Sequence, residues 1–266
     1  MLRRLGFTVV LMLLAVSSTA LAQSESARFH GSAPGHKIDY RGFFDKAENL
    51  ADSPAGQAVL QDCLAAYGGQ EKLASLEGVR IRYEYTTETG RDGQEIIKTF
   101  APGRRYRTIK GIDTRLINGL TCWYEHEDQV AKLDNTRYRA ELFSYLTLTM
   151  PLTAKTENFT AIRHGKKDND DLDYLYFAKS DSLMMILGID PTNHLIKSSV
   201  GIVPQGEQDF VYINEFSDFQ SFDGFIFPKS IVYFSLGIRM GESIIQEVTV
   251  NPDFAPGEFL PRNKTD

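Results

Sequence analysis

Residues 79–87 are Val-Arg-Ile-Arg-Tyr-Glu-Tyr-Thr-Thr, a stretch in which apolar or aromatic residues alternate with polar ones. Successive side chains of a β-strand point to opposite faces, so this period of two predicts a strand with one buried and one solvent-facing side. Antiparallel sheets commonly have one covered face, whereas the strands of parallel sheets are apolar on both. The stretch therefore predicts a half-buried antiparallel strand.

Turn sequences that follow this strand predict a meander. Gly90-Arg91-Asp92-Gly93, Pro102-Gly103 and Asn118-Gly119 each separate two short strand-like runs. Tight hairpin turns favour Gly and Asn, so each of these sites predicts a hairpin. A second series of strand-like runs extends over residues 158–250. The whole chain predicts about ten or eleven strands, with no regular alternation of strand and helix.

Three segments predict helices. Ser53-Pro54 is a suitable N-cap and first residue for a helix that ends at Gly68-Gly69. A short helical segment follows at 71–76, and residues 137–150 carry apolar side chains at helical spacing. We expect a mainly antiparallel β protein of the α+β class, in which one large curved sheet carries two or three helices on one face. The strand spacing also suits a sandwich or a closed barrel.

Two of the later runs, Leu183–Ile189 and Ile231–Leu236, are apolar at nearly every position. A single antiparallel layer needs only one apolar face. The surplus is either covered by helices or lines an apolar cavity that could take a ligand. On the sequence alone both alternatives stay open.

The N-terminal segment predicts a signal peptide over residues 1–22. Arg3 and Arg4 precede an apolar run, and Ala20-Leu21-Ala22 offers a cleavage site before Gln23. A retained anchor is disfavoured, because the run is shorter than the roughly 20 residues that span a bilayer. We expect a soluble, exported protein, with an N-terminal arm at 23–52, one domain at 53–262 and a tail at 263–266.

The charge balance and the missing motifs reduce the number of possible functions. Asp and Glu number 35 against 29 Lys and Arg, for a net charge of −6, so nucleic acid is not an expected partner. The sequence contains no Gly-x-Ser-x-Gly, no P-loop, no Gly-x-Gly-x-x-Gly and no His-Glu-x-x-His. We expect no catalytic residues, no metal site and no cofactor. Cys63 and Cys122 are either joined by a disulfide or buried as separate thiols.

Several short motifs follow one another along residues 55–262. They are Ala65–Gly69 with Lys72-Leu73, Pro102–Arg107, Asn118-Gly119 with Trp123-Tyr124, Ile189–Ile196, Phe219–Gly224, Phe227-Pro228 and Val248–Pro252. In this order they resemble the periplasmic outer-membrane lipoprotein carrier family, the Lol-type carriers, in a divergent LolA-like form. The chain departs from the family pattern in two places: Trp123 and Tyr124 are adjacent instead of separated by one residue, and Asn118 stands where the carriers often have Asp.

The resemblance implies an incomplete, strongly bent barrel with helices as a lid over an apolar cavity. It implies binding and carriage of lipids or acylated lipoproteins, with membrane-bound donor and acceptor proteins as further partners. Arg107 matches the family arginine that ties the lid closed, with Arg104 or Arg105 as alternatives. Trp123 and Tyr124 are expected to face the barrel wall.

From these expectations we select a set of candidate ligand-binding residues from the predicted strands and the second lid helix. The set is Tyr83, Tyr85, Arg107, Trp123, Leu142, Leu146, Met150, Met185 and Tyr233. The alternative function is a non-enzymatic envelope scaffold or sensor that acts through protein contacts at an exposed strand edge.

Overall fold

The computed structural model of the chain describes residues 53–89, 93–148, 161–166, 171–178, 184–205 and 208–262. All of them belong to one compact unit, Asp39–Asp266. The predicted signal peptide at 1–22, the predicted arm at 23–52 and the tail at 263–266 lie outside the described residues. In the described part of the chain, no helix has the length and apolar character that crossing a membrane requires.

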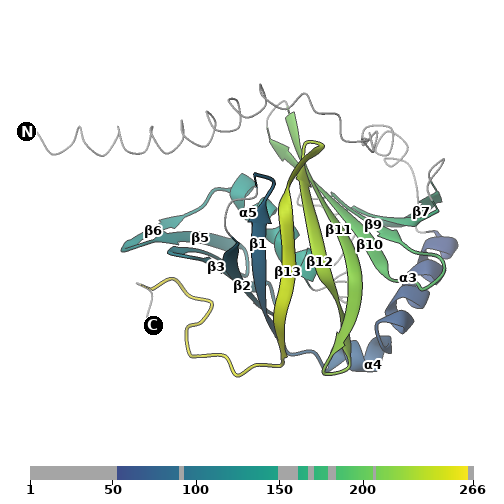
Figure 1. Cartoon of the computed structure of the whole chain (residues 1–266). Helices are drawn as coiled ribbons and strands as arrows, with labels where there is room; N and C mark the ends of the chain where they lie inside the picture. The colour runs from purple at the N-terminus through teal and green to yellow at the C-terminus, as the bar shows by residue number, and fades with distance from the viewer. Residues whose placement is uncertain are drawn as a thin grey trace, which may run out of the picture. The chain divides into compact units, whose positions relative to one another are not determined.

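Thirteen strands of the described residues form one antiparallel sheet (Figure 1). In chain order they are β1 Val79–Thr87, β2 Gln94–Ala101, β3 Arg105–Lys110, β4 Asp113–Asn118, β5 Thr121–His126, β6 Gln129–Lys132, β7 Ala161–Lys166, β8 Asp173–Ala178, β9 Met184–Ile189, β10 Ile196–Gln205, β11 Gln208–Phe222, β12 Phe225–Ser235 and β13 Ile238–Val250. The described helices are α3 Pro54–Ala66, α4 Gly69–Ala74 and α5 Asn135–Leu148.

The sheet joins two meanders through the first and last strands. Strands β1–β6 follow one another on one side and β13–β7 on the other, so β1 pairs with β13 in the middle. Val79 lies opposite Val250, and Thr87 lies opposite Gly241. The curved open sheet of an incomplete barrel, with helices packed on it, confirms the predicted fold class.

The thirteen strands exceed the predicted ten or eleven, and β6 is a strand for which the sequence shows no strand-like run. It has four residues, of which Val130 is the one with a large apolar side chain, so it shows no clear period of two. It forms because the turn at Glu127, with a φ of 49°, folds the chain back onto β5. Hairpin geometry, and not hydrophobic pattern, creates this strand.

Helix α3 forms where the sequence predicts it. The Ser53 side chain accepts a hydrogen bond from the Gly56 backbone N–H at 3.3 Å, and Pro54 is the first helical residue. Gly68, with a φ of 106°, ends the helix in a conformation that glycine adopts at little cost. Helix α3 packs against β7 and β8.

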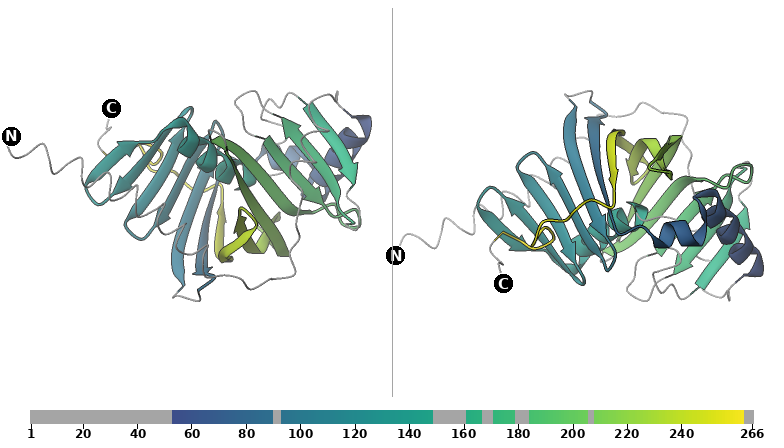
Figure 2. Two further views of the ribbon diagram at one scale, coloured as in Figure 1. Left: turned by 90° about the horizontal axis from the view of Figure 1, so that it is seen from above. Right: turned by 90° about the horizontal axis from the view of Figure 1, so that it is seen from below.

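Helix α5 lies across the same face of the sheet, in contact with β4 and β5 of one half and β10 of the other. Figure 2 shows the two halves of the sheet spreading to either side of this helix. Phe143 of α5 lies so close to Gly201 of β10 that a Cβ at Gly201 would be 2.4 Å from its ring. We call the sheet face toward α3 and α5 the inner face and the opposite side the outer face.

The main hydrophobic core lies between the inner face and the helices. It combines Leu64 of α3 and Leu142 and Leu146 of α5 with strand residues such as Tyr106 and Met185. The surplus apolar residues of the later strands serve two separate cores. Leu187 joins the main core, whereas its neighbour Ile186 belongs to a second cluster on the outer face.

The second cluster spans β8–β11. Its buried members are Tyr174, Ile186, Val200, Ile202, Val211 and Ile213. On the other half of the sheet, the C-terminal segment 251–262 covers the outer face of β1–β5. There Phe259 is buried, and Arg262 hydrogen-bonds through its backbone N–H to Glu125 at 2.8 Å.

Candidate ligand-binding site

An apolar cavity of about 40 Å³ lies on the inner face, where the middle of the sheet meets α5. Strand residues at alternate positions build its wall, because their side chains point to the same face. Among the lining residues are Ile81 and Tyr83 on β1, Ile245 on β13, Ile231 on β12, Phe216 on β11, Thr147 on α5 and Tyr67 at the end of α3.

The volume of this cavity limits what it holds in the conformation described. About 40 Å³ has room for a few water molecules. Pockets for small-molecule ligands measure roughly 300–1,000 Å³. A ligand of ordinary small-molecule size therefore does not fit the cavity in this conformation.

Two arginines fasten α5 to the first half of the sheet. Arg104, in the turn before β3, donates from Nη1 to the Tyr138 hydroxyl at 3.0 Å and from its backbone N–H to the Tyr145 hydroxyl at 3.3 Å. Arg115 of β4 donates to Glu141 of α5 at 2.9 Å. These polar contacts form a latch between the helix and the strand ends.

The interior becomes polar next to the cavity. Lys98 of β2 lies opposite Ile81, and its Nζ is 5.3 Å from the ring centroid of Tyr83 and 5.6 Å from that of Tyr233. Burial opposes the charged form of Lys98, but the negative charges of the neighbouring tyrosines once ionised, led by Tyr233, and that of Glu141 favour it, and the pKa of Lys98 is raised. The Nζ of Lys98 lies near two aromatic rings, whose faces attract an ammonium group.

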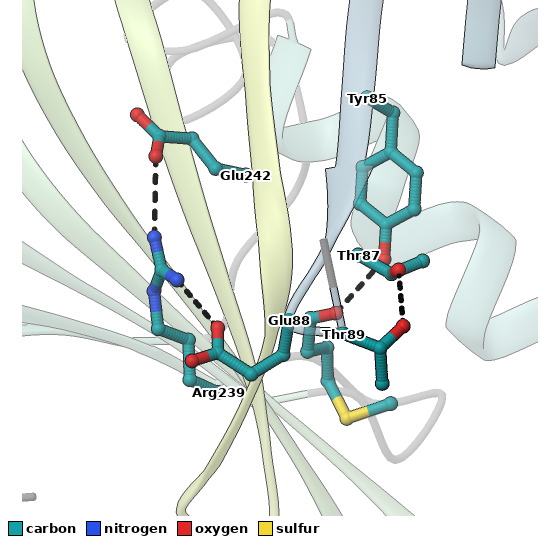
Figure 3. Close-up of polar contacts among 7 residues, drawn as sticks. Tyr85, Thr87, Glu88, Thr89, Arg239 and Glu242 are labelled. Atoms are coloured by element: carbon teal, nitrogen blue, oxygen red, sulfur yellow. Dashed lines mark hydrogen bonds and ion pairs between the residues drawn. The ribbon is translucent and has the colours of Figure 1, made fainter. Parts of the chain in front are cut away.

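The rim of the interior lies where β1 and β13 leave the core. The Tyr85 hydroxyl donates to the Met240 carbonyl at 3.1 Å, and the hydroxyl groups of Thr87 and Thr89 are 2.9 Å apart (Figure 3). Arg239 forms ion pairs with Glu88 and with Glu242. These contacts hold the C-terminal end of β1 against the N-terminal end of β13.

Several predicted ligand-binding residues lie in or against the main core. Tyr83 lines the cavity itself. Leu142, Leu146 and Met185 are fully buried core residues, and Tyr85 and Tyr233 pack against that core from positions nearer the rim. Met150 lies outside the described residues.

Arg107 and Trp123 lie on the outer face and are not brought together with the others. Tyr106 points inward, so its neighbour Arg107 points outward, where its Nη1 donates to the Glu258 carbonyl at 3.3 Å. Cys122 points inward opposite Ile117, so Trp123 points outward opposite Leu116. Of the three arginines considered for the lid contact, Arg104 is the one that reaches α5, while Arg105 donates to the Pro102 carbonyl.

Lys98 is the site residue that sequence reasoning missed. The sequence does carry a signal for it, since Ile96, Lys98 and Phe100 occupy alternate positions of one strand. A lysine at an apolar position of an alternating strand indicates an ammonium group that faces the core.

The two cysteines are free and buried separately, one on α3 and one on β5, which settles the alternative left open by the sequence. Burial raises the pKa of Cys63 to about 12 and, with the nearby Glu141, the pKa of Cys122 to about 12. Neither thiol is a ready nucleophile at neutral pH. Within the described ranges, His, Cys, Asp and Glu form no group of three or more that could hold a metal ion.

No family model and no curated protein matches the chain. Solved structures do. A domain described as outer membrane lipoprotein-sorting from Vibrio parahaemolyticus is 9% identical, covers 76% of this chain and 95% of its own length, and has a TM-score of 0.50. A DUF1329 family protein from Desulfovibrio piger is 9% identical over 76% of this chain and 96% of its own, with a TM-score of 0.53.

A LolA superfamily protein from Nitrosomonas europaea is also similar, at 12% identity over 77% of this chain and 97% of its own, with a TM-score of 0.49. At these identities the likeness concerns the fold. The domain shares its architecture with the lipoprotein-sorting and DUF1329 structures, and the incomplete-barrel fold that the sequence motifs suggest is confirmed.

Proposed function

We propose that the protein binds the acyl chains of lipids or lipoproteins in the apolar interior of its sheet and carries them through the periplasm, without catalysing a reaction. The apolar cavity between the inner face and α5 carries this proposal. The fold shared with a domain described as outer membrane lipoprotein-sorting supports it. Membrane-bound donor and acceptor proteins would be the further partners.

The energetics of acyl binding suit such an interior. Each CH₂ group transferred from water contributes about 0.8 kcal/mol, so a long chain gains useful affinity without specific polar contacts. The cavity wall supplies the matching surface, with Ile81, Ile231 and Ile245 on adjacent strands.

Helix α5 is the element whose displacement would enlarge the interior. It covers the inner face, carries the cavity-lining Thr147 and is held to the first half of the sheet by the latch around Arg104 and Arg115. The latch consists of a few hydrogen bonds, each worth about 0.5–1.5 kcal/mol net, so the larger cost of lifting α5 is the exposure of core side chains such as Leu142 and Leu146, which acyl burial would offset.

The direct test is native mass spectrometry of the protein purified from the periplasm, followed by solvent extraction and identification of any lipid. A co-purifying lipid or acylated peptide supports carriage. A mass without ligand, together with no uptake of added phospholipid or fatty acid, refutes it.

A matched pair of variants links binding to the cavity. Thr147→Phe fills space next to the cavity, and Thr147→Val changes the volume little. We expect the first variant to lose most lipid uptake and the second to retain it. Equal uptake by both would place the bound lipid elsewhere on the protein.

The second candidate function is a scaffold or sensor that works through protein contacts. Exposed apolar side chains at the tip of the β12–β13 hairpin favour it, since Leu236 is 58% and Ile238 53% exposed. Failure to take up lipid combined with a partner that is lost on Leu236→Ser would favour this function over carriage.

A further inference from the structure

Three buried hydroxyl groups on the inner face have no hydrogen-bond partner among the residues that the structure describes. They are Tyr83 Oη, Tyr233 Oη and Ser243 Oγ. Tyr83 and Ser243 are each 1% exposed. An unpaired buried polar group destabilises the folded state, and native interiors contain few of them. Three in one region therefore need an explanation.

The three groups lie close together on adjacent strands. Tyr83 is on β1, Ser243 on β13 and Tyr233 on β12. Ser243 lies opposite Tyr85 on one side and Ile231 on the other, so Tyr83 and Tyr233 are each one inward-facing position from its direct partners. Cross-strand neighbours at such diagonal positions are about 7–8 Å apart, within reach of aromatic side chains.

The ammonium group of Lys98 belongs to the same region. It lies over the rings of Tyr83 and Tyr233. Among the described residues it forms no ion pair, and Glu141, whose charge acts on Lys98, is instead paired with Arg115 at 2.9 Å. A partly buried cation without a carboxylate partner is favoured when another anion accompanies it.

The polar region continues directly from the apolar cavity along the same strands. Ile81 precedes Tyr83 by two residues on β1, Ile231 precedes Tyr233 on β12, and Ile245 follows Ser243 on β13. Because β13 runs antiparallel to both neighbours, these steps all point the same way, from the cavity toward the polar groups. The register also places polar groups directly beside the cavity wall, since Tyr83 lies opposite Ile245, Ser243 opposite Ile231 and Lys98 opposite Ile81.

We propose that Lys98, Tyr83, Tyr233 and Ser243 bind the anionic headgroup, a carboxylate or a phosphate, of an acyl ligand whose chain occupies the apolar cavity. This inference rests on the proposed function and names the ligand class within it. The ammonium and the three hydroxyl groups are all hydrogen-bond donors toward such an anion. Burial raises the pKa of Tyr83, so its phenol stays protonated and donates.

Three ligands that share one chain and differ in headgroup test the inference: laurate, dodecyl phosphate and dodecanol. Affinities are measured by calorimetric titration of the full chain. Hydrogen bonds to a charged group are worth about 1.5–3 kcal/mol, so we expect at least tenfold tighter binding of one or both anions than of dodecanol. Whichever anion binds more tightly identifies the headgroup chemistry.

Lys98→Met removes the charge and keeps an unbranched side chain. We expect it to abolish the preference for the anion while dodecanol affinity stays within about twofold. Lys110→Met is the matched control, because Lys110 lies over the Tyr85 ring at 4.9 Å but nearer the rim. Tyr233→Phe is a second variant that removes one donor and leaves the ring in place, and we expect it to reduce the preference several-fold.

The outcomes separate the inference from the proposed function. If dodecanol and both anions bind equally to the unchanged protein, or if Lys98→Met and Tyr233→Phe both keep the anion preference, the headgroup site is refuted and acyl binding stands. If none of the three ligands binds, acyl carriage and the headgroup site are both refuted.

Discussion

The guanidinium of Arg104 lies 3.0 Å from the hydroxyl of Tyr138, to which its Nη1 donates, and this contact joins the turn between β2 and β3 to helix α5. The same arginine donates from its backbone N–H to the hydroxyl of Tyr145, seven residues further along α5. A turn residue and a lid helix are thereby held together at the point from which α5 would have to lift.

Arg104→Ala should weaken this latch. We expect α5 to exchange its amide hydrogens several-fold faster and the free energy of unfolding to fall by about 1 kcal/mol, because one partly buried side-chain hydrogen bond is lost. Hydrogen exchange of residues 135–148 measures the effect. Arg105→Ala is the control, since its side chain donates to Pro102 and does not reach α5. Identical exchange in the two variants would contradict the latch.

The C-terminal segment should contribute to stability through Glu125. This fully buried carboxylate accepts hydrogen bonds from the Arg262 backbone N–H at 2.8 Å and from its Nε at 3.3 Å. Removal of residues 252–266 takes away these donors and uncovers the apolar surface on which Phe259 is buried, so we expect a loss of several kcal/mol. Trp123 is the one tryptophan of the sequence and lies on the same outer face, so its emission should shift to longer wavelength.

Glu125→Gln is the companion variant for the C-terminal segment. It removes the charge but can still accept a hydrogen bond, so a smaller loss is expected than on truncation. Denaturant unfolding followed by Trp123 emission compares the two. A truncated protein as stable as the full chain would show that the segment contributes nothing to the free energy of unfolding.

Stability should decline at alkaline pH because of the buried thiols. The pKa of Cys63 and that of Cys122 are raised from 9.0 to about 12 by burial. Below pH 9 both thiols are protonated in the folded and the unfolded chain, and their contribution is fully present. Between pH 9 and 12 only the unfolded chain ionises, so stability is lost as pH rises.

Denaturant midpoints from pH 7 to 11 measure this decline, and Cys63→Ala is expected to reduce its slope. Iodoacetamide at pH 8 provides an independent readout. We expect slow labelling of the folded protein and rapid labelling of both thiols after unfolding. Fast labelling of the folded chain would contradict the burial of the two cysteines.

Gly201→Ala should disturb the contact between α5 and β10. The new Cβ would lie 2.4 Å from the ring of Phe143, so the ring or the helix must shift, and we expect a loss of about 1–3 kcal/mol. Gly165→Ala is the control, because its Cβ would meet Tyr176 at an ordinary 3.4 Å. Thermal unfolding compares the variants, and equal melting temperatures would argue against tight packing of α5 on β10.

The sequence predicted those features that neighbouring residues encode. The alternation in 79–87 predicted β1, Asn118-Gly119 predicted the β4–β5 hairpin, and Ser53-Pro54 with Gly68 predicted the bounds of α3. Strand period, turn conformation and helix capping are properties of a few consecutive residues, so they can be predicted without knowledge of the rest of the fold. The antiparallel class and the helical cover follow from them.

The candidate site was predicted less completely. Tyr83 lines the cavity and Leu142, Leu146 and Met185 lie in the core, because apolar residues at alternate or helical positions face inward wherever the sheet is covered. Arg107 and Trp123 lie on the outer face, because each directly follows a strand residue whose side chain faces the core. Which of two adjacent strand residues faces the cavity depends on which face of the sheet the core covers.

Local pattern determined the class of the fold, whereas long-range contact determined the site. The pairing of β1 with β13 brings Tyr83 beside Ser243, and residues 251–262 cover the outer face of strands that precede them by more than a hundred positions. Such pairings depend on which surfaces bury the most apolar area once the whole chain is folded. No short stretch of sequence determines that total buried area.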